Sequence, residues 1–476
     1  MLQQPLKYLS TEDMQSMHRV CLDILWERGM RITHSKARDM LIDAGARLNA
    51  RTQMVCIPPD LVMDCLKKVP QRFQLRGRGQ RCTDVIVGHG QTPPVRIVSG
   101  TMGYIDPESR QYRPATDNDV RQWACLLNGL ENIHIATAMF PQNLPISVRE
   151  AAMMKILWEN TTKPLMLVPD DVRQYRAIVE MALAIRGGEK KLRQRPLMAC
   201  LVAATSPGIL QDKGVEMILL SGRYGIPLLL NSTPIMGATA PVTVAGGVVQ
   251  TNLEVLAQIV IAQLAFPGTP VVHRGNPIAM DMAGGGAMAA SVECALAEAL
   301  IVQLVHDTYR IPVDAFGMHT DAVTADGQSQ MERTLNTLLS ALSGVSIIAG
   351  AGQMDHGNAL DPVQLVLDDQ LMTMIYHVLQ GVEVDAATMA PDLIAATGPG
   401  EDFLNCSHTL RHFRKGMLRL PCTNRLSRSA WEQAGQKEMR ELAQEKALKQ
   451  LSEPKADPLD PALKKELDCI LKAYRH

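Results

Sequence analysis

Short apolar runs alternate with longer amphipathic stretches from about residue 131 onward. The runs are continuous rather than alternating in polarity, which is typical of parallel strands buried on both faces. Successive runs are separated by roughly 30–45 residues, the length that a strand, a helix and two loops need. The predicted strands are residues 133–140, 164–169, 196–203, 226–231, 269–273, 311–316, 345–349 and, with the weakest pattern, 382–389.

The stretches between these runs carry helix signals. Val172, Tyr175 and Val179 share one helical face, and the glycine pair 187–188 marks the end of that helix. Asp361 followed by Pro362 is typical of a helix start, with the aspartate as the N-cap and proline in the first turn. Helices therefore follow the predicted strands in regular alternation.

Eight strand–helix units predict an α/β protein with a closed (β/α)8 TIM barrel. An open, doubly wound sheet is the alternative, but no GxGxxG sequence follows an early strand, which disfavours a dinucleotide-binding version. We divide the chain into a mainly helical N-terminal segment (1–95), the barrel (96–395) and a C-terminal capping loop with helices (396–476). Residues 95–106 look like a further strand and turn at the first boundary.

Composition narrows the class of protein. The 476 residues are 46% hydrophobic, enough for a large core, and the net charge of -1 argues against nucleic acid or an anionic membrane as the main partner. The ten cysteines form no CxxC pair or disulfide pattern, and the N-terminus lacks the apolar core of a signal peptide. No strictly apolar run approaches the length of a membrane span. We expect a cytoplasmic enzyme.

Polar residues cluster where the predicted strands end, which is where barrel enzymes place their active sites. Asn231 ends the fourth predicted strand, His273 and Arg274 the fifth, and Phe316 the sixth. The loops that follow the sixth and seventh predicted strands carry further polar side chains and three glycines. Those loop residues are Gly317, His319, Asp321, Gly350, Gly352, Gln353, Asp355 and His356.

Several familiar chemistries leave no trace in the sequence. There is no Walker motif, no GxSxG elbow and no HExxH. A zinc site would have to combine Cys200, His273 and His319, whose spacing matches no compact zinc motif, so we expect no metal.

Four long blocks resemble the trimethylamine methyltransferase family of corrinoid-dependent enzymes. They are LDILWERGMRITHSKARDMLIDAGARLNARTQMVCIPPDLV (22–62), SGTMGYIDPESRQYRPATDNDV (99–120), QSQMERTLNTLLSALSGVSIIAGAGQMDHGNALDPVQLVLDDQ (328–370) and GPGEDFLNCSHTLRHFR (398–414). The resemblance covers nearly the whole chain. It implies a barrel enzyme that moves a methyl group from an amine to the cobalt of a separate corrinoid (cobalamin) protein.

The trimethylamine enzymes of that family carry pyrrolysine, whereas this sequence contains only ordinary amino acids. The resemblance is therefore to the branch without pyrrolysine, which is associated with quaternary amines. It implies glycine betaine as the substrate and dimethylglycine as the product, with proline betaine, carnitine and γ-butyrobetaine as alternatives. We expect a cognate corrinoid protein as partner, no tightly bound cofactor in the chain itself, and association into a homo-oligomer.

The implied substrate suggests roles for the candidate residues. A quaternary nitrogen is stabilised by aromatic faces or carboxylates, for which Phe140, Phe316, Tyr104, Asp321 and Asp355 are available. A betaine carboxylate is bound by arginine or histidine. The candidates are Arg274, His273, His319 and His356, with Gln353 and Asn231 as further polar contacts.

His356 interrupts the third family block, so we expect it to select the substrate. Gly317, Gly350 and Gly352 are the candidates for close approach of the corrinoid. Residues 408–414 either cap the mouth, contact the corrinoid partner or pack as a structural helix.

Two other functions stay open at this stage. One is a zinc-dependent methanol or thiol methyltransferase. The other is a non-enzymatic solute-binding protein.

Overall fold

Seven parallel strands form one sheet in the computed structural model, which describes residues 5–79, 84–453 and 456–474. Ile135 and Ala136 close this sheet into a barrel, because they bridge in parallel to Arg96 on one side and Leu165 on the other. The predicted (β/α)8 barrel is therefore confirmed. Around the barrel the sheet contains β6 (Val95–Ile97), β9 (Leu165–Leu167), β10 (Met198–Ala203), β12 (Leu228–Ser232), β14 (Val271–Gly275), β17 (Val313–Ala315) and β18 (Ile347–Ala351).

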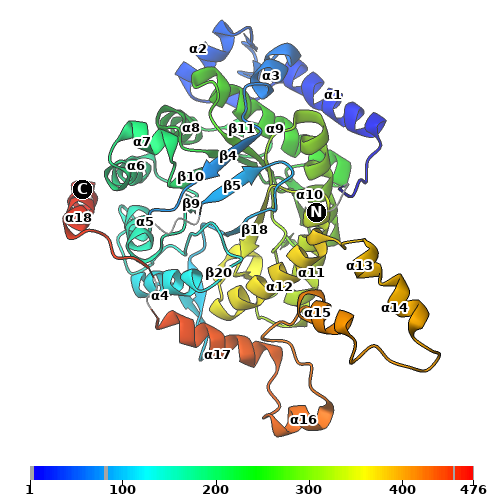
Figure 1. Cartoon of the computed structure of the whole chain (residues 1–476). Helices are drawn as coiled ribbons and strands as arrows, with labels where there is room; N and C mark the ends of the chain where they lie inside the picture. Colours follow the sequence, from blue (N-terminus) through cyan, green and yellow to red (C-terminus); the bar gives the residue numbers. More distant parts are fainter. Residues whose placement is uncertain (1–4, 80–83, 454–455, 475–476) are drawn as a thin grey trace.

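A helix follows each of the eight wall segments, and the helices form the outer ring of Figure 1. The predicted capping signals hold, since Gly187 ends one helix with φ 77° and the Asp361 side chain accepts from the N–H of Val363 at the start of another. The eight are α4 (Asp117–Asn128), α5 (Arg149–Asn160), α6 (Val172–Arg186), α8 (Asp212–Tyr224), α9 (Val244–Ala265), α10 (Val292–Leu304), α11 (Gly327–Leu342) and α12 (Pro362–Gln380).

The prediction of an eighth strand at 382–389 is wrong. Val382 is 88% exposed, and Ala386–Met389 forms a short helix, α13. The missing wall segment is β6, near the start of the chain, which pairs in parallel with β18. Because that pairing closes the barrel, no free sheet edge remains for residues 382–389.

Side chains that point into the barrel form a small core of their own. It contains Met166, Leu229, Val272 and Ile347, and the hairpin of β4 (Arg72–Leu75) and β5 (Val85–Gly88) packs against them. The N–H of Arg76 donates to the carbonyl of Pro196, just before β10 begins. The hairpin therefore closes the N-terminal end of the barrel, and its C-terminal end is the mouth.

Three N-terminal helices cover α9. They are α1 (Thr11–Glu27), α2 (Ser35–Asp43) and α3 (Pro59–Leu66), each in contact with α9. Among the described residues α9 alone is long and apolar enough to cross a bilayer, but 78% of its most apolar stretch is buried inside the protein. This is the pattern of a core helix.

The remaining elements are short. The mouth carries the sheet of β7 (Gly103–Ile105), β8 (Tyr112–Pro114), β19 (Gln353–Met354) and β20 (Ala359–Leu360), the turn η2 (Asp355–Gly357), and a sheet of β13 (Ile235–Met236), β15 (Ile278–Met280) and β16 (Ala287–Met288). Elsewhere lie β1 (Arg31–Ile32) with β11 (Ile209–Leu210), β2 (Arg47–Leu48) with β3 (Val55–Cys56), α7 (Glu189–Gln194) and the π-helix η1 (Val305–Tyr309).

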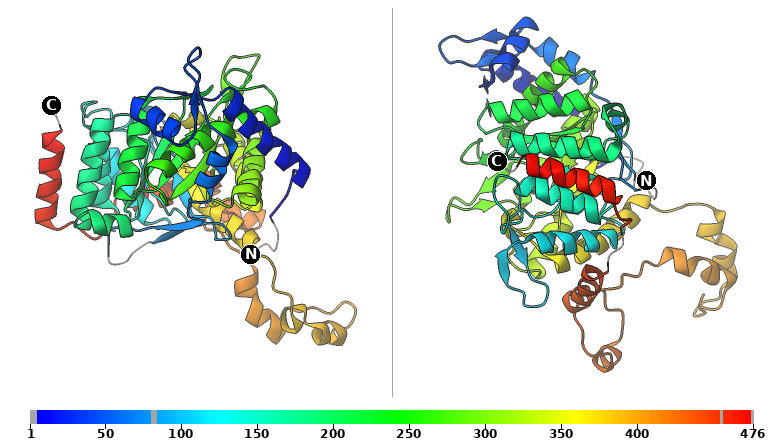
Figure 2. Two further views of the ribbon diagram at one scale, coloured as in Figure 1. Left: turned by 90° about the horizontal axis from the view of Figure 1, so that it is seen from above. Right: turned by 90° about the vertical axis from the view of Figure 1, so that its left-hand side faces the viewer.

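After α12 the chain leaves the barrel and later returns to it. Residues 382–436, which we name the arm, project from the body in the right-hand view of Figure 2, except around Cys422, which is buried and whose N–H donates to Gln370 of α12. The arm contains α13, α14 (Pro391–Ala396), α15 (Ser407–Gly416) and α16 (Arg428–Gln433). The chain then returns through α17 (Met439–Leu451), which packs on α12 and α4, and α18 (Pro461–Ala473), which packs on α5 and α6.

The corrected strand assignment predicts that an apolar truncation in β6 destabilises the protein, whereas one at residue 382 has little effect. Ile97 is completely buried in β6, so Ile97→Ala should lower the free energy of unfolding by about 2–5 kcal/mol, the usual cost of a core cavity. Val382→Ala should change it by less than about 0.5 kcal/mol, because that side chain is exposed. Urea denaturation of both variants checks this. A large loss in the free energy of unfolding for Val382→Ala would show that residues 382–389 belong to the core.

Candidate active site

Four polar side chains share the interior of the barrel near its mouth. Side chains alternate between the two faces of a strand, and Leu229 and Val272 belong to the inner core. Two residues further along each strand, Asn231 and Arg274 therefore point inward as well. Arg96 from β6 and Asp314 from β17 meet them there, and all four side chains are buried.

Asp314 holds two arginines together. It accepts from Arg96 Nε at 2.6 Å and from Arg96 Nη2 at 2.9 Å, a two-pronged ion pair. Its Oδ1 also lies 3.3 Å from Arg274 Nε, within ion-pair range although not aligned for a hydrogen bond. Arg274 Nη1 donates to Asn231 Oδ1. The cluster thus joins strands β6, β12, β14 and β17 through the interior of the barrel.

The cluster carries an excess of positive charge. One carboxylate, Asp314, faces two guanidinium groups, which stay protonated in proteins. A further carboxyl that interacts with Arg274 is that of Glu298 of α10, which accepts from the N–H of Phe316 at 2.9 Å. Burial raises the pKa of Glu298 to about 8, so at neutral pH it is mostly uncharged. Burial and the charge of Arg96 both lower the pKa of Arg274.

The ring of Phe316 lies beside this cluster. The guanidinium carbon of Arg274 is 4.7 Å from the ring centroid and that of Arg96 is 5.4 Å from it. The imidazole of His319 lies 3.6 Å from the same centroid, tilted by 35°. Phe316 therefore already contacts two arginines and a histidine. It serves the arginine cluster rather than offering a free face to a substrate ammonium.

His319 leads from the cluster toward the surface. Its Nδ1 donates to the carbonyl of Ala289 at 3.1 Å, and burial lowers its pKa well below the usual range. The N–H of Ala289 itself and that of Ala290 donate to the carboxylate of Asp321 at 3.0 and 3.3 Å. His319 and Asp321 thus both bond to the backbone of the loop at residues 289–290.

His356 and Asp321 are in contact at the mouth of the barrel, the region where the sequence predicted both side chains. His356 Nδ1 donates to Asp321 Oδ1 at 2.8 Å, and the imidazole is 39% exposed. Asp355 and His356 both adopt positive φ, 51° and 52°, which is uncommon for residues other than glycine. Asp355 is half-buried beside this pair, and its N–H donates to the carbonyl of Ala322. The role of His356 in substrate selection stays a prediction.

An open cleft of about 740 Å³ surrounds this pair. Its charged lining is acidic, since Asp281, Asp321 and Glu332 contribute carboxylates, whereas lysine and arginine are absent from the described residues that line it. A chain of contacts from Arg274 through Phe316, His319 and the Ala289 loop links the cleft to the buried arginines. The mouth therefore has a cationic interior and an acidic rim.

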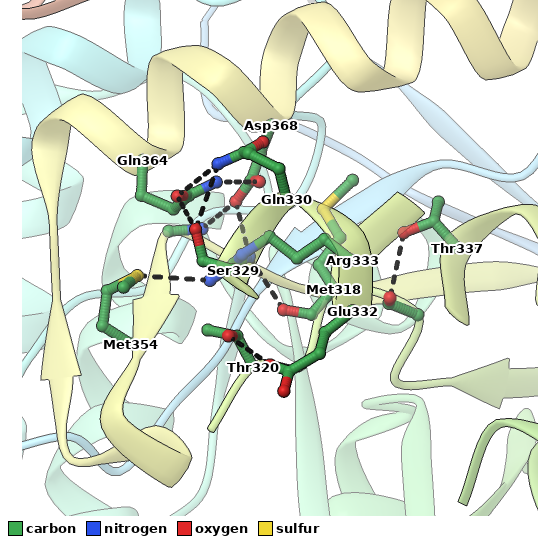
Figure 3. A network of polar contacts seen from close by, with 12 residues as sticks. Met318, Thr320, Ser329, Gln330, Glu332, Arg333, Thr337, Met354, Gln364 and Asp368 are labelled. Atoms are coloured by element: carbon green, nitrogen blue, oxygen red, sulfur yellow. Dashed lines mark hydrogen bonds and ion pairs between the residues drawn. The ribbon is translucent and has the colours of Figure 1, made fainter. Parts of the chain in front are cut away.

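Buried polar groups fix the loops that carry this site (Figure 3). Arg333 of α11 donates to Asp368 of α12 at 2.9 Å and to the carbonyl of Met318 at 2.8 Å. Asp368 also accepts from the N–H of Gly352 at 2.7 Å and from Gln364. Glu332, next to Arg333, accepts from Thr320 and from the N–H of Asp321. These contacts thus fix the positions of the loops after β17 and β18 relative to each other.

Two predicted site residues point away from the barrel interior. His273 is between the inward-facing Val272 and Arg274, so its ring faces α9, where Nε2 contacts Asn252 at 3.1 Å. Burial there lowers the pKa of His273 to about 3. Cys200 faces outward likewise, because its neighbours Ala199 and Leu201 belong to the inner core. The structure thus does not bring together Cys200, His273 and His319, the residues of the zinc alternative.

The two remaining aromatic candidates contact other arginines. Tyr104 of β7 is buried against Arg113, whose guanidinium carbon is 4.8 Å from the ring centroid. Phe140 is buried near Arg149, at 5.6 Å. Among the three aromatic candidates, Phe316 is the one whose ring lies over the Arg274 cluster.

The three glycines assigned to the corrinoid are buried and close to protein atoms. A Cβ on Gly350 would lie 2.9 Å from the ring of Phe316, on Gly352 2.7 Å from Trp123, and on Gly317 2.9 Å from the backbone of Thr337. Packing therefore accounts for all three. Their role in corrinoid contact stays a prediction.

Gln353 is a candidate with open hydrogen-bonding capacity. It is completely buried, and neither its amide nitrogen nor its amide oxygen has a hydrogen-bond partner. Thr101 Oγ1 and Asn276 Oδ1, in the loops that follow β6 and β14, are buried and unpartnered as well. Such groups are costly to bury, so a bound molecule at the mouth that pairs with them would gain free energy.

The helix α15, which contains residues 408–414, lies in the arm. His408 Nε2 donates to the carbonyl of Ala387 in α13, so α15 contacts another helix of the arm. The interpretation that residues 408–414 cap the mouth of their own barrel is therefore wrong. The α12 helix runs away from the mouth, so the arm starts at the opposite end.

Sequence reasoning missed Arg96, Asp314 and Glu298. A signal was present for the first two, since each is a charged residue inside an apolar strand run, VRIV and IPVDAF. Charged residues in such positions are rare unless they are paired, so they identify one another. Glu298 lies in an apolar helical stretch, and its position beside β17 depends on how α10 packs.

Comparison with known proteins finds a family that matches nearly the whole chain. Residues 2–474 match the family model described as trimethylamine methyltransferase. Trimethylamine methyltransferase MttB of Desulfitobacterium hafniense (strain DSM 10664 / DCB-2) is 30% identical over 463 residues, which cover 97% of this chain and 92% of that protein. Glycine betaine methyltransferase of Desulfitobacterium hafniense (strain Y51) is 26% identical over 469 residues, 98% of this chain and 96% of that protein.

A solved structure shows the same fold. The crystal structure of the Methanosarcina barkeri monomethylamine methyltransferase MtmB aligns with a TM-score of 0.53 at 13% identity. The alignment covers 94% of this chain and 88% of that one.

The Arg333–Asp368 pair gives a stability prediction. Asp368→Ala leaves a buried guanidinium without its carboxylate and should lower the free energy of unfolding by about 3–5 kcal/mol. Asp39, which is exposed on α2, provides the control, and Asp39→Ala should change it by less than about 0.5 kcal/mol. Chemical denaturation compares the two. Equal midpoints would show that the network does not hold the mouth loops.

Proposed function

The chain belongs to the trimethylamine methyltransferase family, and from that premise we propose that it moves a methyl group from glycine betaine to the cobalt of a corrinoid carried by a separate protein. Family membership makes the chain a methyltransferase. The observation that carries the choice of substrate is the excess positive charge buried inside the barrel at Arg274. The resemblance to the branch without pyrrolysine also favours a quaternary amine, because the sequence contains only ordinary amino acids.

A betaine carboxylate would offset that charge. An unpaired charge held away from water costs several kcal/mol, and an arriving anion recovers part of that cost. Arg274 offers a planar guanidinium whose Nε is not aligned with any hydrogen-bond acceptor, a suitable donor for a carboxylate oxygen. Trimethylamine carries no anionic group, so it cannot use this feature of the site.

The acidic rim suits the other end of the same molecule. A quaternary ammonium group has no N–H to donate, so it is held by charge and by contact rather than by hydrogen bonds. The carboxylates of Asp281, Asp321 and Glu332 line the cleft that opens to solvent. At 4 Å, opposite charges near a protein surface attract by about 4 kcal/mol. The arrangement would point the carboxylate inward and the methyl groups toward the mouth.

This orientation fits the chemistry of the transfer. A quaternary nitrogen is already a good leaving group, because it departs as a neutral tertiary amine. The N–CH₃ bond breaks with its electron pair remaining on nitrogen, so no protein group needs to donate or accept a proton there. A reduced corrinoid brought by the partner protein would supply the electron pair for the new bond to the methyl carbon. The residues of this chain bind the substrate, orient it and hold the N–CH₃ bond toward the open mouth.

Proline betaine, carnitine and γ-butyrobetaine share the two charges of glycine betaine and remain alternative substrates. They differ in the distance between carboxylate and ammonium, so they would bridge the arginine cluster and the acidic rim differently. The zinc alternative has less support, because its three residues are dispersed across the barrel wall. The nine cysteines in the described part of the chain are all free, in keeping with a reducing cytoplasm, where we propose that the reaction takes place.

A substrate panel tests the proposal. Cob(I)alamin is mixed with the enzyme and glycine betaine, proline betaine, carnitine, γ-butyrobetaine or trimethylamine, and the cobalt spectrum reports methylation. We expect methylation with glycine betaine. Arg274→Met should raise the KM for the betaine roughly 10- to 100-fold, since a hydrogen bond to a charged group is worth about 1.5–3 kcal/mol.

The variant should fold, because Arg96 and Asp314 still form a balanced pair. Arg121→Met, on the exposed surface of α4, is the control and should leave the KM unchanged. Methylation from trimethylamine alone, with Arg274→Met without effect, would overturn the assignment.

Glu298 predicts how betaine binding depends on pH. Its raised pKa, about 8, means that it gains a negative charge as the pH rises through that value, which cancels the excess positive charge of the cluster. The KM for the betaine should therefore rise between about pH 7 and 9. Glu298→Gln stays neutral and still accepts from the N–H of Phe316, so its KM should stay flat.

Glu150 of α5 is the matched control, because burial raises its pKa to about 7 but it lies outside the arginine cluster. Glu150→Gln should keep the pH dependence of the unmodified enzyme. An equal rise of KM in Glu298→Gln would exclude Glu298 as its origin.

A further inference from the structure

The arm leaves the barrel at the end opposite the mouth. Tyr376, near the end of α12, donates through its hydroxyl to the carbonyl of Pro93, two residues before β6 begins. The last turn of α12 therefore lies at the N-terminal end of the strands. From there the arm extends outward, as Figures 1 and 2 show. Its position separates it from the candidate active site.

The arm exposes large apolar side chains along its whole length. A single solvated domain rarely leaves so many together, because each loses the free energy of burial. They lie on successive short helices and on the loops between them, so no single face of the arm could hide them by folding down. The exposed residues are Val382, Val384, Met389, Ile394, Phe403, Leu404, Leu410, Phe413, Met417 and Leu426.

The arm is divided into two halves of opposite charge. Residues 382–404, the acidic half, contain five Asp or Glu and no Lys or Arg. Residues 405–428, the basic half, contain six Lys or Arg and no Asp or Glu. Over the described side chains of the arm, no ion pair joins the two halves. Arg428 pairs with Glu432, which lies just beyond the basic half, and the other charges of the two halves are available to another molecule.

We propose that the arm packs against the arm of a second copy of this chain, with the acidic half of each on the basic half of the other. A two-fold axis produces this pairing twice, because each surface then meets its complement in both directions. The apolar side chains of both halves would be buried between the two arms. The pattern is self-complementary within one sequence, which favours a second copy over an unrelated partner. This inference does not rest on the proposed substrate.

Charge-reversed variants of the full chain test the pairing. Arg411→Glu with Arg414→Glu makes both halves acidic, and Asp392→Lys with Glu401→Lys makes both halves basic. Light scattering after size exclusion should give a dimer, or a multiple of it, for the unmodified chain, and at least a tenfold weaker association for each variant alone. An equimolar mixture of the two variants should associate again, because acidic arms then meet basic arms.

The control reverses two charges far from the arm. Arg19→Glu with Arg51→Glu changes exposed positions of the N-terminal segment and should leave the association unchanged. Circular dichroism and melting of every variant confirm that the barrel is intact.

Three results would overturn the proposal. The first is a monomeric unmodified chain at micromolar concentration, including one that associates only when a corrinoid protein is added. The second is unchanged association of both variants. The third is a mixture of variants that stays as weakly associated as its components.

Discussion

The ion pair between Arg96 and Asp314 crosses the interior of the barrel, and the geometry of the site depends on it. Arg96 comes from the first strand of the barrel and Asp314 from the seventh wall segment, so the pair fixes which residues of both strands point inward. A shift of one residue in either strand would turn the charge out of the barrel and put an apolar side chain in its place. The strand register that closes the barrel thus also determines the geometry of the site.

The same pair explains why a second arginine can remain in the interior. Asp314 balances one positive charge, and Arg274 shares it at a longer distance of 3.3 Å. A stability-optimised barrel would replace such a cluster with apolar side chains, since buried ion pairs rarely improve stability over well-packed hydrophobic residues. The protein keeps two arginines, an uncharged Glu298 and several unpartnered polar atoms in one region. That concentration of unfavourable features is typical of a binding site whose ligand completes the interactions.

The barrel could be predicted from hydrophobic runs because most wall strands are buried on both faces and bounded by turns. Seven of the eight predicted runs do form wall segments, while the apolar pattern at Val382 and Val384 belongs to the arm instead. Hydrophobicity alone cannot separate a strand buried in the barrel from a segment covered by another molecule. Val95–Ile97 escaped the count because Arg96 interrupts a run of only three residues.

The positions of the candidate site residues along the chain could be predicted. The direction in which each side chain points was harder to predict. Strand ends drew attention to Asn231, Arg274, His319, Asp321 and His356, and their roles stay predictions. His273 is adjacent to Arg274 in sequence and yet faces α9, because neighbouring side chains on a strand point to opposite faces. Counting from an inner-core residue such as Val272 would have separated the two. Glu298 lay beyond this reasoning, since only the packing of α10 on the barrel brings it to Phe316.

The opposite placement of mouth and arm has a consequence for how the molecule meets other proteins. A methyl group can reach a large corrinoid domain only if the mouth stays uncovered. The arm starts at the closed end of the barrel, so association through arms would leave both mouths of a pair accessible. The acidic rim and the charge-divided arm are therefore independent surfaces. Under the two proposals, the acidic rim would bind the substrate cation and face the corrinoid protein, and the arm would join copies of the chain.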